Sequence, residues 1–588
     1  MKKTKIKTIA TMFAIFFAVG NGNAQTPSLL WQAHYSPQGQ NDSLTDVELT
    51  LNQSWDANVY VCGRQGVSAS SSYALINSYT SAGAQNGGSW PAVMDLGFGG
   101  INVFNAVTTR VLSSTQTDIY ACGQGWGGAL PLGDMLIAKY NKSGVQQWKW
   151  YRDNGNAETF QAIAVDQSTG AVYAAGRSTT NAGDIIVAAV SSGGGSLWAG
   201  DYIVYNTGSV DNVFTCMKLV GNNLYVVGYN KVTATNHDVV LLRINIANGA
   251  ILTTAIWDNT ALASDRDEAF GIDTDPSGNV YLVGTTQNTT SPGDVDGLLL
   301  KFTSLAAPVC STYYNNIVYS LGDELRSIDV VSTSEIYVTG FTQATGSNNS
   351  DYLTMKYDGT SCTTMSNPTW VKFFDGTGSG APSANDDIGY MVMKSSNSGK
   401  IFVTGRSYET TVGFNATTVR YTTAGVQETS FSYDRGSTDN SGAYKYPMEL
   451  IYDACYAKDH TYIAGYTREA GAGTPTDATL VKYGWSGPCT EGPIVEGRMM
   501  TSEVATGGAK IYPNPFNGKA TFISATETIY ANASFIVFDI MGKEVKRMEN
   551  MNAFEFEIDM NGFANGLYFY KYIGNEIVLS SGKFVISQ

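Results

Sequence analysis

One short motif dominates this sequence: an apolar, strand-like segment with an aromatic second residue and a glycine at its end, best seen in Val280–Gly284. The motif recurs every 52 to 65 residues. A period of this size is typical of repeat architectures, in which each copy forms one small structural unit. Because the copies are short strands bounded by turn residues, we predict an all-β chain. The eight copies, spaced 52 to 65 residues apart, are Val59–Gly63, Ile119–Gly123, Val172–Gly176, Leu224–Gly228, Val280–Gly284, Ile336–Gly340, Ile401–Gly405 and Thr461–Gly465.

Each repeat contains four strand-like pieces joined by turn residues. In the fifth repeat we expect strands at Ala269–Asp273, Val280–Thr285, Gly297–Phe302 and Tyr313–Tyr319. Glycine and asparagine between the first two of these supply the backbone angles of a tight turn. Four short strands of this kind predict a four-stranded antiparallel sheet for each repeat.

The two ends of the repeat array complement each other. The eighth repeat leaves the pattern after Asp477–Tyr483 and has no fourth strand, whereas Leu29–Tyr35, ahead of the first repeat, resembles the fourth strand Val145–Tyr151. We therefore predict that the N-terminal strand completes the last sheet and closes residues 25–485 into one eight-bladed β-propeller. Closure also removes the exposed strand edges that favour aggregation.

The repeat unit resembles a known bacterial family. An acidic residue precedes an apolar strand, a turn such as Asp275–Asn279 leads into the glycine motif, and strands such as Asp351–Tyr357 and a Gly-x-x-x-Trp segment follow. This pattern is similar to the bacterial β-propeller repeat abbreviated SBBP, over about residues 28–485. The resemblance implies a propeller fold and secretion, and it implies no single activity.

A second domain follows a linker. Residues 486–508 are rich in Gly, Pro, Ser and Thr and lack periodicity, which indicates a linker. Residues 509–588 contain short alternating strands and predict a small Ig-like β-sandwich. This segment is similar to the type A C-terminal sorting domain of type IX secretion substrates of Bacteroidetes. The residues that carry the resemblance are Tyr512, Pro513, Asn514, Pro515, Asp539, Gly542, Lys543, Gly566, Tyr568 and Lys583.

That second resemblance implies a route of export. It implies passage through the type IX translocon, removal of the domain by a surface peptidase and, often, attachment of the remainder to surface lipopolysaccharide. The N-terminus is consistent with export, because residues 1–24 combine a basic start, an apolar segment and Ala24 before Gln25, as in a secretory signal peptide. We expect a secreted or surface-displayed monomer of a Gram-negative bacterium, without a transmembrane segment.

Charge, cysteine content and histidine content limit the partners, disulfides and metal sites that we expect. The formal net charge is −15, and such a surface repels phosphate backbones, so we expect no nucleic-acid partner. The seven cysteines leave the pairing open, with Cys310, Cys362 and Cys489 as the better disulfide candidates. Cys62 and Cys122 fall within the repeated motif and are expected to be buried thiols. The three histidines, His34, His237 and His460, form no recognisable metal or nucleophile pattern.

The most regular polar feature is a carboxylate that precedes the first strand in six repeats. If these positions converge in a closed ring, they would favour a hard cation such as Ca²⁺, and we expect no other cofactor. The alternative is that each carboxylate caps the loop into its own strand through backbone N–H groups. The six candidate residues are Asp46, Glu158, Asp211, Asp267, Asp323 and Asp386.

These patterns favour a non-enzymatic exported propeller whose loops bind a protein or glycan ligand, in an adhesion or scaffold role. No catalytic motif accompanies the repeats. One alternative is a secreted propeller enzyme that acts on polysaccharide, with carboxylates performing acid–base work. The other is a structural component of a surface or gliding machinery.

Overall fold

The computed structural model describes two parts of the chain, and the signal peptide and linker expected from the sequence lie outside them. In both parts the regular secondary structure is almost entirely β-strand, and one short helix, α1 (Cys362–Met365), is present in the described residues. The described residues are 27–485, apart from 38, 52–56, 69, 98, 114–115, 127–132, 179–182, 260–264, 288–294, 317–321, 344–349, 377–386, 396–397, 410–412, 434–450, 453–459 and 469–475, and 510–587, apart from 513–515, 524–532, 540–543, 550–554 and 575–576.

Residues 27–485 form eight four-stranded antiparallel sheets in their described part, numbered here in chain order. Sheets 1 to 4 contain β2 (Ser43–Leu51), β3 (Ala57–Ser68), β4 (Ser71–Tyr79) and β5 (Ala92–Met94); β6 (Val103–Ser113), β7 (Gln116–Gly125), β8 (Asp134–Asn141) and β9 (Gln146–Arg152); β10 (Glu158–Val165), β11 (Val172–Ser178), β12 (Asp184–Val190) and β13 (Tyr202–Tyr205); and β14 (Asp211–Val220), β15 (Asn223–Lys231), β16 (His237–Asn245) and β17 (Ile251–Trp257).

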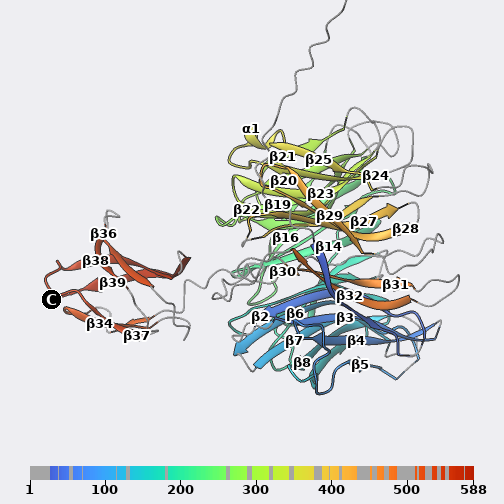
Figure 1. The fold of residues 1–588 in the computed structure, drawn as a ribbon, viewed down its shortest axis with the longest axis horizontal. Coiled ribbons are helices and arrows are strands. Elements are labelled where there is room, and N and C mark those ends of the chain that lie inside the picture. The colour runs from blue at the N-terminus through green and yellow to red at the C-terminus, as the bar shows by residue number, and fades with distance from the viewer. Residues whose placement is uncertain are drawn as a thin grey trace, which may run out of the picture.

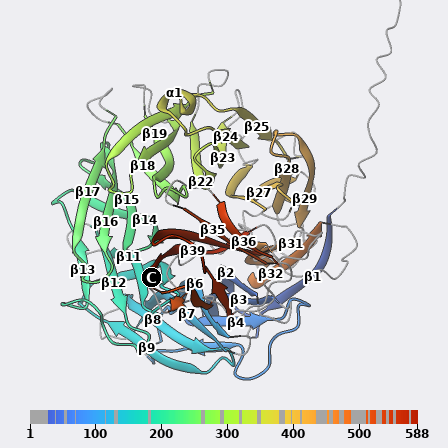
Figure 2. The ribbon, with the colours of Figure 1, turned by 90° about the vertical axis from the view of Figure 1, so that its left-hand side faces the viewer.

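The remaining four sheets follow the same order. Sheets 5 to 8 contain β18 (Glu268–Thr274), β19 (Val280–Thr286), β20 (Asp296–Phe302) and β21 (Pro308–Tyr314); β22 (Asp323–Ser332), β23 (Glu335–Gln343), β24 (Ser350–Tyr357) and β25 (Trp370–Phe374); β26 (Ile388–Lys394), β27 (Ile401–Glu409), β28 (Gly413–Tyr421) and β29 (Gln427–Tyr433); and β30 (Ile451–Tyr452), β31 (His460–Arg468), β32 (Thr476–Trp485) and β1 (Pro27–Tyr35). Figure 1 shows the sheets as a stack of ribbons, and Figure 2 shows them following one another around a common centre.

The first strands of the sheets lie nearer that centre and the fourth strands lie at the periphery (Figure 2). Sheet 5 agrees with the sequence-based expectation for its first three strands. The fourth strand was predicted at Tyr313–Tyr319 and is found at Pro308–Tyr314. A tight turn explains the difference, because Thr303 N–H bonds the Ala307 carbonyl at 2.8 Å and so returns the chain at once.

The N-terminal strand belongs to the last sheet, as predicted. β1 pairs antiparallel with β32, from Pro27 opposite Trp485 to Tyr35 opposite Ala478. Sheet 8 therefore combines the first and last strands of this part of the chain, and its fourth strand comes from the N-terminus.

Buried apolar clusters join the sheets to one another. Each pair of consecutive sheets, from sheets 1 and 2 to sheets 7 and 8, shares one such cluster. The last and first sheets share one too, because Tyr462 and Leu480 of sheet 8 pack in the same cluster as Val61 of sheet 1. The core is thus divided among the contacts between sheets, and burial of these apolar faces is the main force that holds the sheets together.

A β-bulge explains the glycine that ends each motif. In sheet 5 Gly284 lies opposite Ala269, and the strand pairing shifts by one residue between Ala269 and Gly271. The bulge turns the Glu268 carbonyl oxygen toward Gly284, into the space that a Cβ atom would occupy. The same shift opposite the motif glycine recurs in sheets 1, 2, 3, 4, 6 and 7.

Tryptophans tie neighbouring sheets together at the periphery. Trp198 lies 4% exposed, packs on Tyr173 of its own sheet and donates from Nε1 to the Ile246 carbonyl of sheet 4 at 2.9 Å. Its ring covers Gly249, whose φ of +75° belongs to the turn between β16 and β17. Trp90, Trp148 and Trp370 make the same indole-to-carbonyl bond to the sheet that follows theirs.

Trp198→Ala is therefore expected to destabilise the protein by about 3–5 kcal/mol, the range for truncation of a buried large aromatic side chain. The loss combines apolar burial, the ring contact with Tyr173 and the bond to sheet 4. Urea unfolding followed by circular dichroism measures it. Leu197→Ala is the matched control, because the adjacent Leu197 is 42% exposed. Equal losses for both variants would contradict this role of Trp198.

The C-terminal part has its own core. A three-stranded sheet contains β33 (Lys510–Tyr512), β34 (Lys519–Ile523) and β37 (Glu555–Asp559), and a four-stranded sheet contains β36 (Glu544–Met548), β35 (Ser534–Phe538), β38 (Gly566–Gly574) and β39 (Ile577–Ile586). Side chains of both sheets, Phe522 and Phe535 among them, meet in one buried cluster that contains residues of this part alone. Two sheets facing a shared apolar core form a small β-sandwich.

Candidate functional site

A polar residue stands at the entrance to the first strand of sheets 1 to 7. This polar residue lies two positions before the residue that pairs with the motif glycine. In sheet 5 Gly284 pairs with Ala269, so the polar residue is Asp267. In sheet 6 Gly340 pairs with Leu325, so it is Asp323. We call this the junction position, because it follows the connection from the preceding sheet. In sheets 1 to 7 it is occupied by Asp42, Asn102, Glu158, Asn212, Asp267, Asp323 and Asp387.

The structure corrects part of the sequence-based set. Glu158, Asp267 and Asp323 occupy the junction position, and Asp386 lies outside the described residues, next to Asp387. Asp46 lies further along β2, where it accepts hydrogen bonds from the Val47 and Val107 amides at 2.9 and 2.8 Å. Its assignment as an equivalent position is wrong, because the turn between the first two strands varies in length among repeats.

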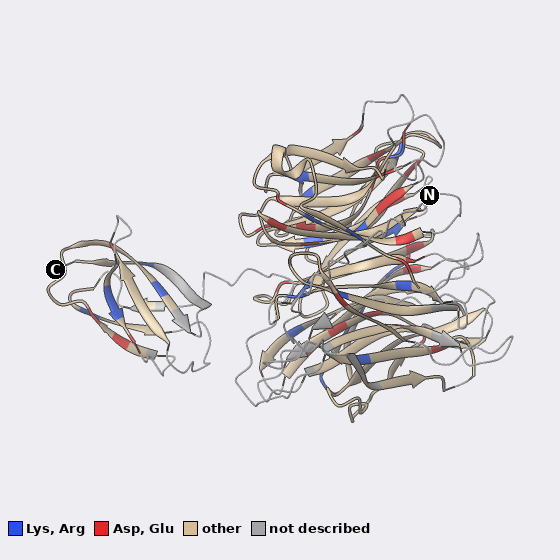
Figure 3. Ribbon diagram, turned by 45° about the horizontal axis from the view of Figure 1, so that its top comes forward, with Lys and Arg blue, Asp and Glu red and all other residues tan. Residues whose placement is uncertain are grey.

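Asp211 was also misaligned, by one residue, since Asn212 holds the junction position in sheet 4. Its carboxylate pairs with Arg177 at 2.9 Å and Lys231 at 3.1 Å. Figure 3 shows acidic residues distributed over several sheets. Among the described residues, Asp267 is the single member of the predicted ring that belongs to a group of three ligand-type side chains.

Three junction carboxylates, Asp267, Asp323 and Asp387, accept a hydrogen bond from an amide in the connection that leads into their own strand. This geometry is the capping alternative considered from the sequence, in which a side-chain oxygen satisfies a loop amide. Two junction carboxylates also bond the second strand of their sheet, because Thr286 Oγ1 donates to Asp267 at 2.6 Å and Ser178 Oγ to Glu158 at 3.1 Å. The loop amides are Asn259 N–H to Asp267 at 2.6 Å, Asn316 N–H to Asp323 at 2.7 Å and Gly376 N–H to Asp387 at 3.0 Å.

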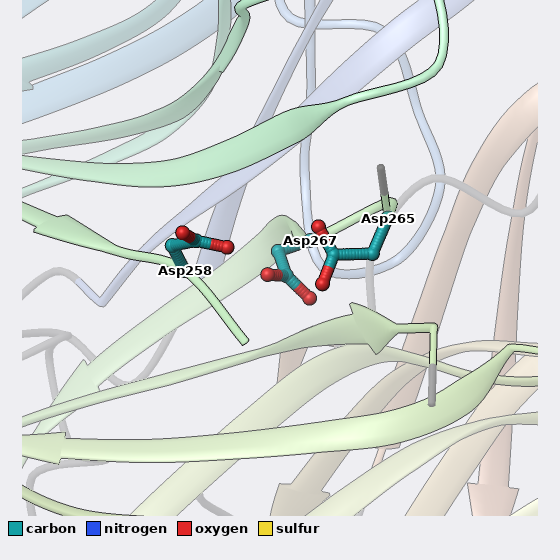
Figure 4. Close-up of side chains that lie close together, drawn as sticks. All are labelled: Asp258, Asp265 and Asp267. Carbon is teal, nitrogen blue, oxygen red and sulfur yellow. The ribbon is translucent and has the colours of Figure 1, made fainter. Parts of the chain in front are cut away.

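Two groups of aspartates gather around this position in the described part of the chain. The first contains Asp258, Asp265 and Asp267, and one carboxylate oxygen from each lies within 4.8 Å of the others. Figure 4 shows the three carboxyl groups of this group pointing toward one another. The second group meets the same criterion and contains Asp351, Asp375 and Asp387.

The groups occupy related places in the fold. Asp258 and Asp375 directly follow the fourth strands β17 and β25, and Asp267 and Asp387 stand at the junction position of the next sheet. Burial raises the pKa of Asp267 to about 7, and repulsion from neighbouring aspartates adds to the effect. Burial likewise raises the pKa of Asp351 to about 7, together with repulsion from Asp375 and Asp387. Such sites favour either a proton or a bound cation.

Neither aspartate group includes a histidine among the described residues. His34 Nδ1 lies 3.1 Å from Thr479 Oγ1. His237 is buried, stacks on Tyr229 and places Nδ1 2.6 Å from Glu268 Oε1. The side chain of His460 is outside the described residues.

The cysteines include one disulfide. Cys310 of β21 bonds to Cys362 of α1 and links sheets 5 and 6. Both belong to the trio favoured from the sequence, and the third, Cys489, lies outside the described residues. Cys62 and Cys122 are buried thiols, as expected.

Three of the predicted sorting residues lie at or directly after the end of a strand in the C-terminal sheets. Tyr512 ends β33, Asp539 directly follows β35, and Gly566 begins β38. Tyr568 is buried and donates its hydroxyl to the Ala564 carbonyl at 3.0 Å, whereas Lys583 in β39 is exposed. Pro513, Asn514, Pro515, Gly542 and Lys543 lie outside the described residues.

Comparison with known families identifies this C-terminal part. Residues 510–587 match the family described as secretion system C-terminal sorting domain. The domain is that of type IX secretion, and the chain is a secreted, surface-associated protein delivered by that system. Its larger part is all-β and built of four-stranded sheets. Within the described residues no helix has the length and apolarity that a membrane crossing requires.

Comparison with other proteins adds little to this identification. No curated protein sequence matches the chain. Among solved structures it is similar to the WD40 domain of SCAP from fission yeast, at 10% identity and a TM-score of 0.36, over 78% of this chain and 98% of that one. It is also similar to quinohemoprotein alcohol dehydrogenase from Comamonas testosteroni, at 10% identity and a TM-score of 0.30, over 83% and 81% of the two chains.

A third similar structure is a protein of unknown function from Bacteroides caccae, at 11% identity and a TM-score of 0.29, over 54% of this chain and 94% of that one. At these identities and TM-scores, none of the three structures assigns an activity or a ligand to this protein.

Proposed function

We propose that this protein is a type IX secretion substrate whose larger part is an eight-bladed, SBBP-type β-propeller that binds a protein or glycan at the surface of a Gram-negative bacterium. The match of residues 510–587 to the sorting family is the observation that carries the export part of the proposal. The surface peptidase and the translocon are the partners that such a domain would meet.

Two observations support a closed propeller. β1 completes sheet 8 by pairing with β32, so the chain returns to its starting sheet. The cluster shared by sheets 8 and 1 then gives the last sheet the same kind of neighbour as the others. A closed arrangement leaves every sheet packed on both faces, whereas an open array would leave two faces uncovered.

The binding role, in adhesion or as a scaffold, is supported by the contacts of the junction carboxylates. Asp267, Asp323 and Asp387 accept hydrogen bonds from amides near the start of the connections between sheets, those of Asn259, Asn316 and Gly376. Loops held on a rigid all-β frame are suited to recognition. The expected protein is a monomer without catalytic activity. A glycan array together with a hydrolysis screen on the purified protein separates a binder from a polysaccharide-degrading enzyme, and turnover would refute the proposal.

Deletion of residues 510–588 is expected to prevent surface delivery, because the sorting domain is the signal read by the translocon. Cell fractionation followed by immunoblotting measures the outcome, with the truncated protein retained inside the envelope. The larger part should keep its melting temperature, since the C-terminal core shares no residue with it.

A reporter fused to residues 486–588 provides the converse experiment. This reporter should reach the cell surface in the native host and remain inside a host strain that lacks the translocon. Surface delivery of the truncated protein, or retention of the fused reporter, would argue against the sorting role.

A further inference from the structure

Asp265 is the most anomalous carboxylate among the described residues. Its side chain is 0% exposed, and neither of its oxygens accepts a hydrogen bond from another residue. A buried carboxylate normally has charged or hydrogen-bonding partners, because removing it from water without them is costly. Asp267, in the same group, has such partners, because it accepts hydrogen bonds from Asn259 and Thr286.

The backbone holds Asp265 where it is. Its N–H donates to Asn236 Oδ1 at 3.2 Å, and its carbonyl accepts from the His237 amide at 2.8 Å. Arg266 then forms a parallel bridge with His237, and the Asp267 amide donates to the His237 carbonyl. In such a bridge alternate side chains share one side, so Asp265 and Asp267 face the same way and Arg266 faces the other.

The surrounding charges do not neutralise Asp265. Burial, with repulsion from Asp258 and Asp238, raises the pKa of Asp265 to about 6. The basic side chains of this junction have another partner, because Arg266 Nη2 and His237 Nδ1 lie 3.0 and 2.6 Å from Glu268 Oε1. Figure 4 shows the three carboxyl groups converging on one space, and among the described residues no Lys or Arg side chain forms an ion pair with Asp265.

We propose that Asp258, Asp265 and Asp267 bind a Ca²⁺ ion between sheets 4 and 5. Calcium accepts six to eight oxygen ligands at about 2.3–2.6 Å, so oxygens within 4.8 Å of one another can share one ion. Water would complete the coordination, and the exposed side chain of Asp258 leaves a path of entry. Extracellular calcium modules bind with dissociation constants of about 10⁻⁴–10⁻³ M, which suits a protein delivered outside the cell.

Such an ion would cross-link two segments of the chain. It would join the residue after β17 to the two residues that lead into β18, and it would replace the missing partners of Asp265. This site is distinct from a ring of equivalent carboxylates, because all three ligands belong to one connection between two sheets. It is also independent of the ligand bound by the loops.

Calcium titration of the mature full-length protein, after removal of metal with EDTA, tests the proposal. Calorimetry should show binding, and the melting temperature should rise by a few degrees with Ca²⁺. In Asp265→Asn the ion bound at this site should be lost, or bound about tenfold or more weakly. The same variant should be at least as stable as the wild type without calcium, because it removes an unpaired buried charge.

Asp95→Asn is the matched control. Asp95 directly follows the fourth strand of sheet 1, as Asp258 follows that of sheet 4, but Tyr73 and Asn102 stand where Asp238 and Asp267 stand. This variant should keep the wild-type stoichiometry. If Asp265→Asn does not fold, the exposed Asp258→Asn supplies the same measurement. Equal calcium stoichiometry and an equal rise in melting temperature in the wild type and these site variants would overturn the proposal.

Discussion

Gly284→Ala is expected to lower the free energy of unfolding substantially. An ordinary overpacking substitution costs about 1–3 kcal/mol, and the loss here should be larger. The added Cβ would lie closer to the Glu268 carbonyl oxygen than van der Waals contact allows, and that oxygen belongs to a paired backbone. The strain has no flexible side chain to absorb it, so the bulge itself must move. Thermal unfolding monitored by circular dichroism is the measurement, with a large fall in melting temperature or loss of soluble protein expected.

Gly87→Ala is the control for this substitution. A Cβ at Gly87 meets no atom within 4 Å and its φ is not in the left-handed region, so its effect should stay within about 0.5 kcal/mol. Gly340→Ala should reproduce the large effect, because a Cβ there would collide with the Glu324 carbonyl oxygen in the same way. If Gly284→Ala is tolerated as well as the control, close approach of the backbone is not the reason for the motif glycine.

The glycine shows where sequence reasoning succeeds and where it stops. The period and the strand before Gly284 can be predicted from the chain alone, because both depend on local pattern. The bulge opposite Gly284 depends on how β18 pairs with β19, and no local pattern states that register. The sequence therefore identifies the repeat but not the physical reason for its most regular residue.

The alignment of the acidic residues from sequence was partly wrong for a related reason. Counting residues from the motif tyrosine correctly placed Asp267 and Asp323 but misplaced Asp46 and Asp211. The turn joining the first two strands is longer in sheet 1 than in sheet 4, and chain distance changes with it. Only the pairing with the motif glycine restores the alignment. Asp265 was missed altogether, because its significance lies in burial without a partner, which is a tertiary property.

The disulfide was predicted in part. Cys310 and Cys362 were both favoured because they lie near strand ends or in loops, where a sulfur can reach a neighbour. Their pairing was left open, since 52 residues separate them in the chain. It follows from the packing of sheet 6 beside sheet 5, which brings α1 to β21.

Removal of residues 25–35 is expected to have the second large effect, because β1 supplies the fourth strand of sheet 8. Its loss would expose the backbone of β32 along its whole paired length, from Ala478 to Trp485. An exposed edge of this kind favours pairing with other chains. A lower melting temperature and concentration-dependent association, measured by calorimetry and size-exclusion chromatography, are the expected results.

A rescue experiment separates strand pairing from general damage. Adding a peptide of residues 27–35 in trans should raise the melting temperature of the truncated protein and return it to the monomer. A peptide of the same sequence but with proline in place of Ala33 should not, since Ala33 pairs with Leu480 inside the strand and proline is disfavoured within a paired strand. A truncated protein as stable and monomeric as the full chain would show that β1 is dispensable, and closure by the N-terminal strand would then be wrong. Recovery with the unmodified peptide but not with the proline peptide would support pairing of the N-terminal strand with β32 as the contact that closes the chain.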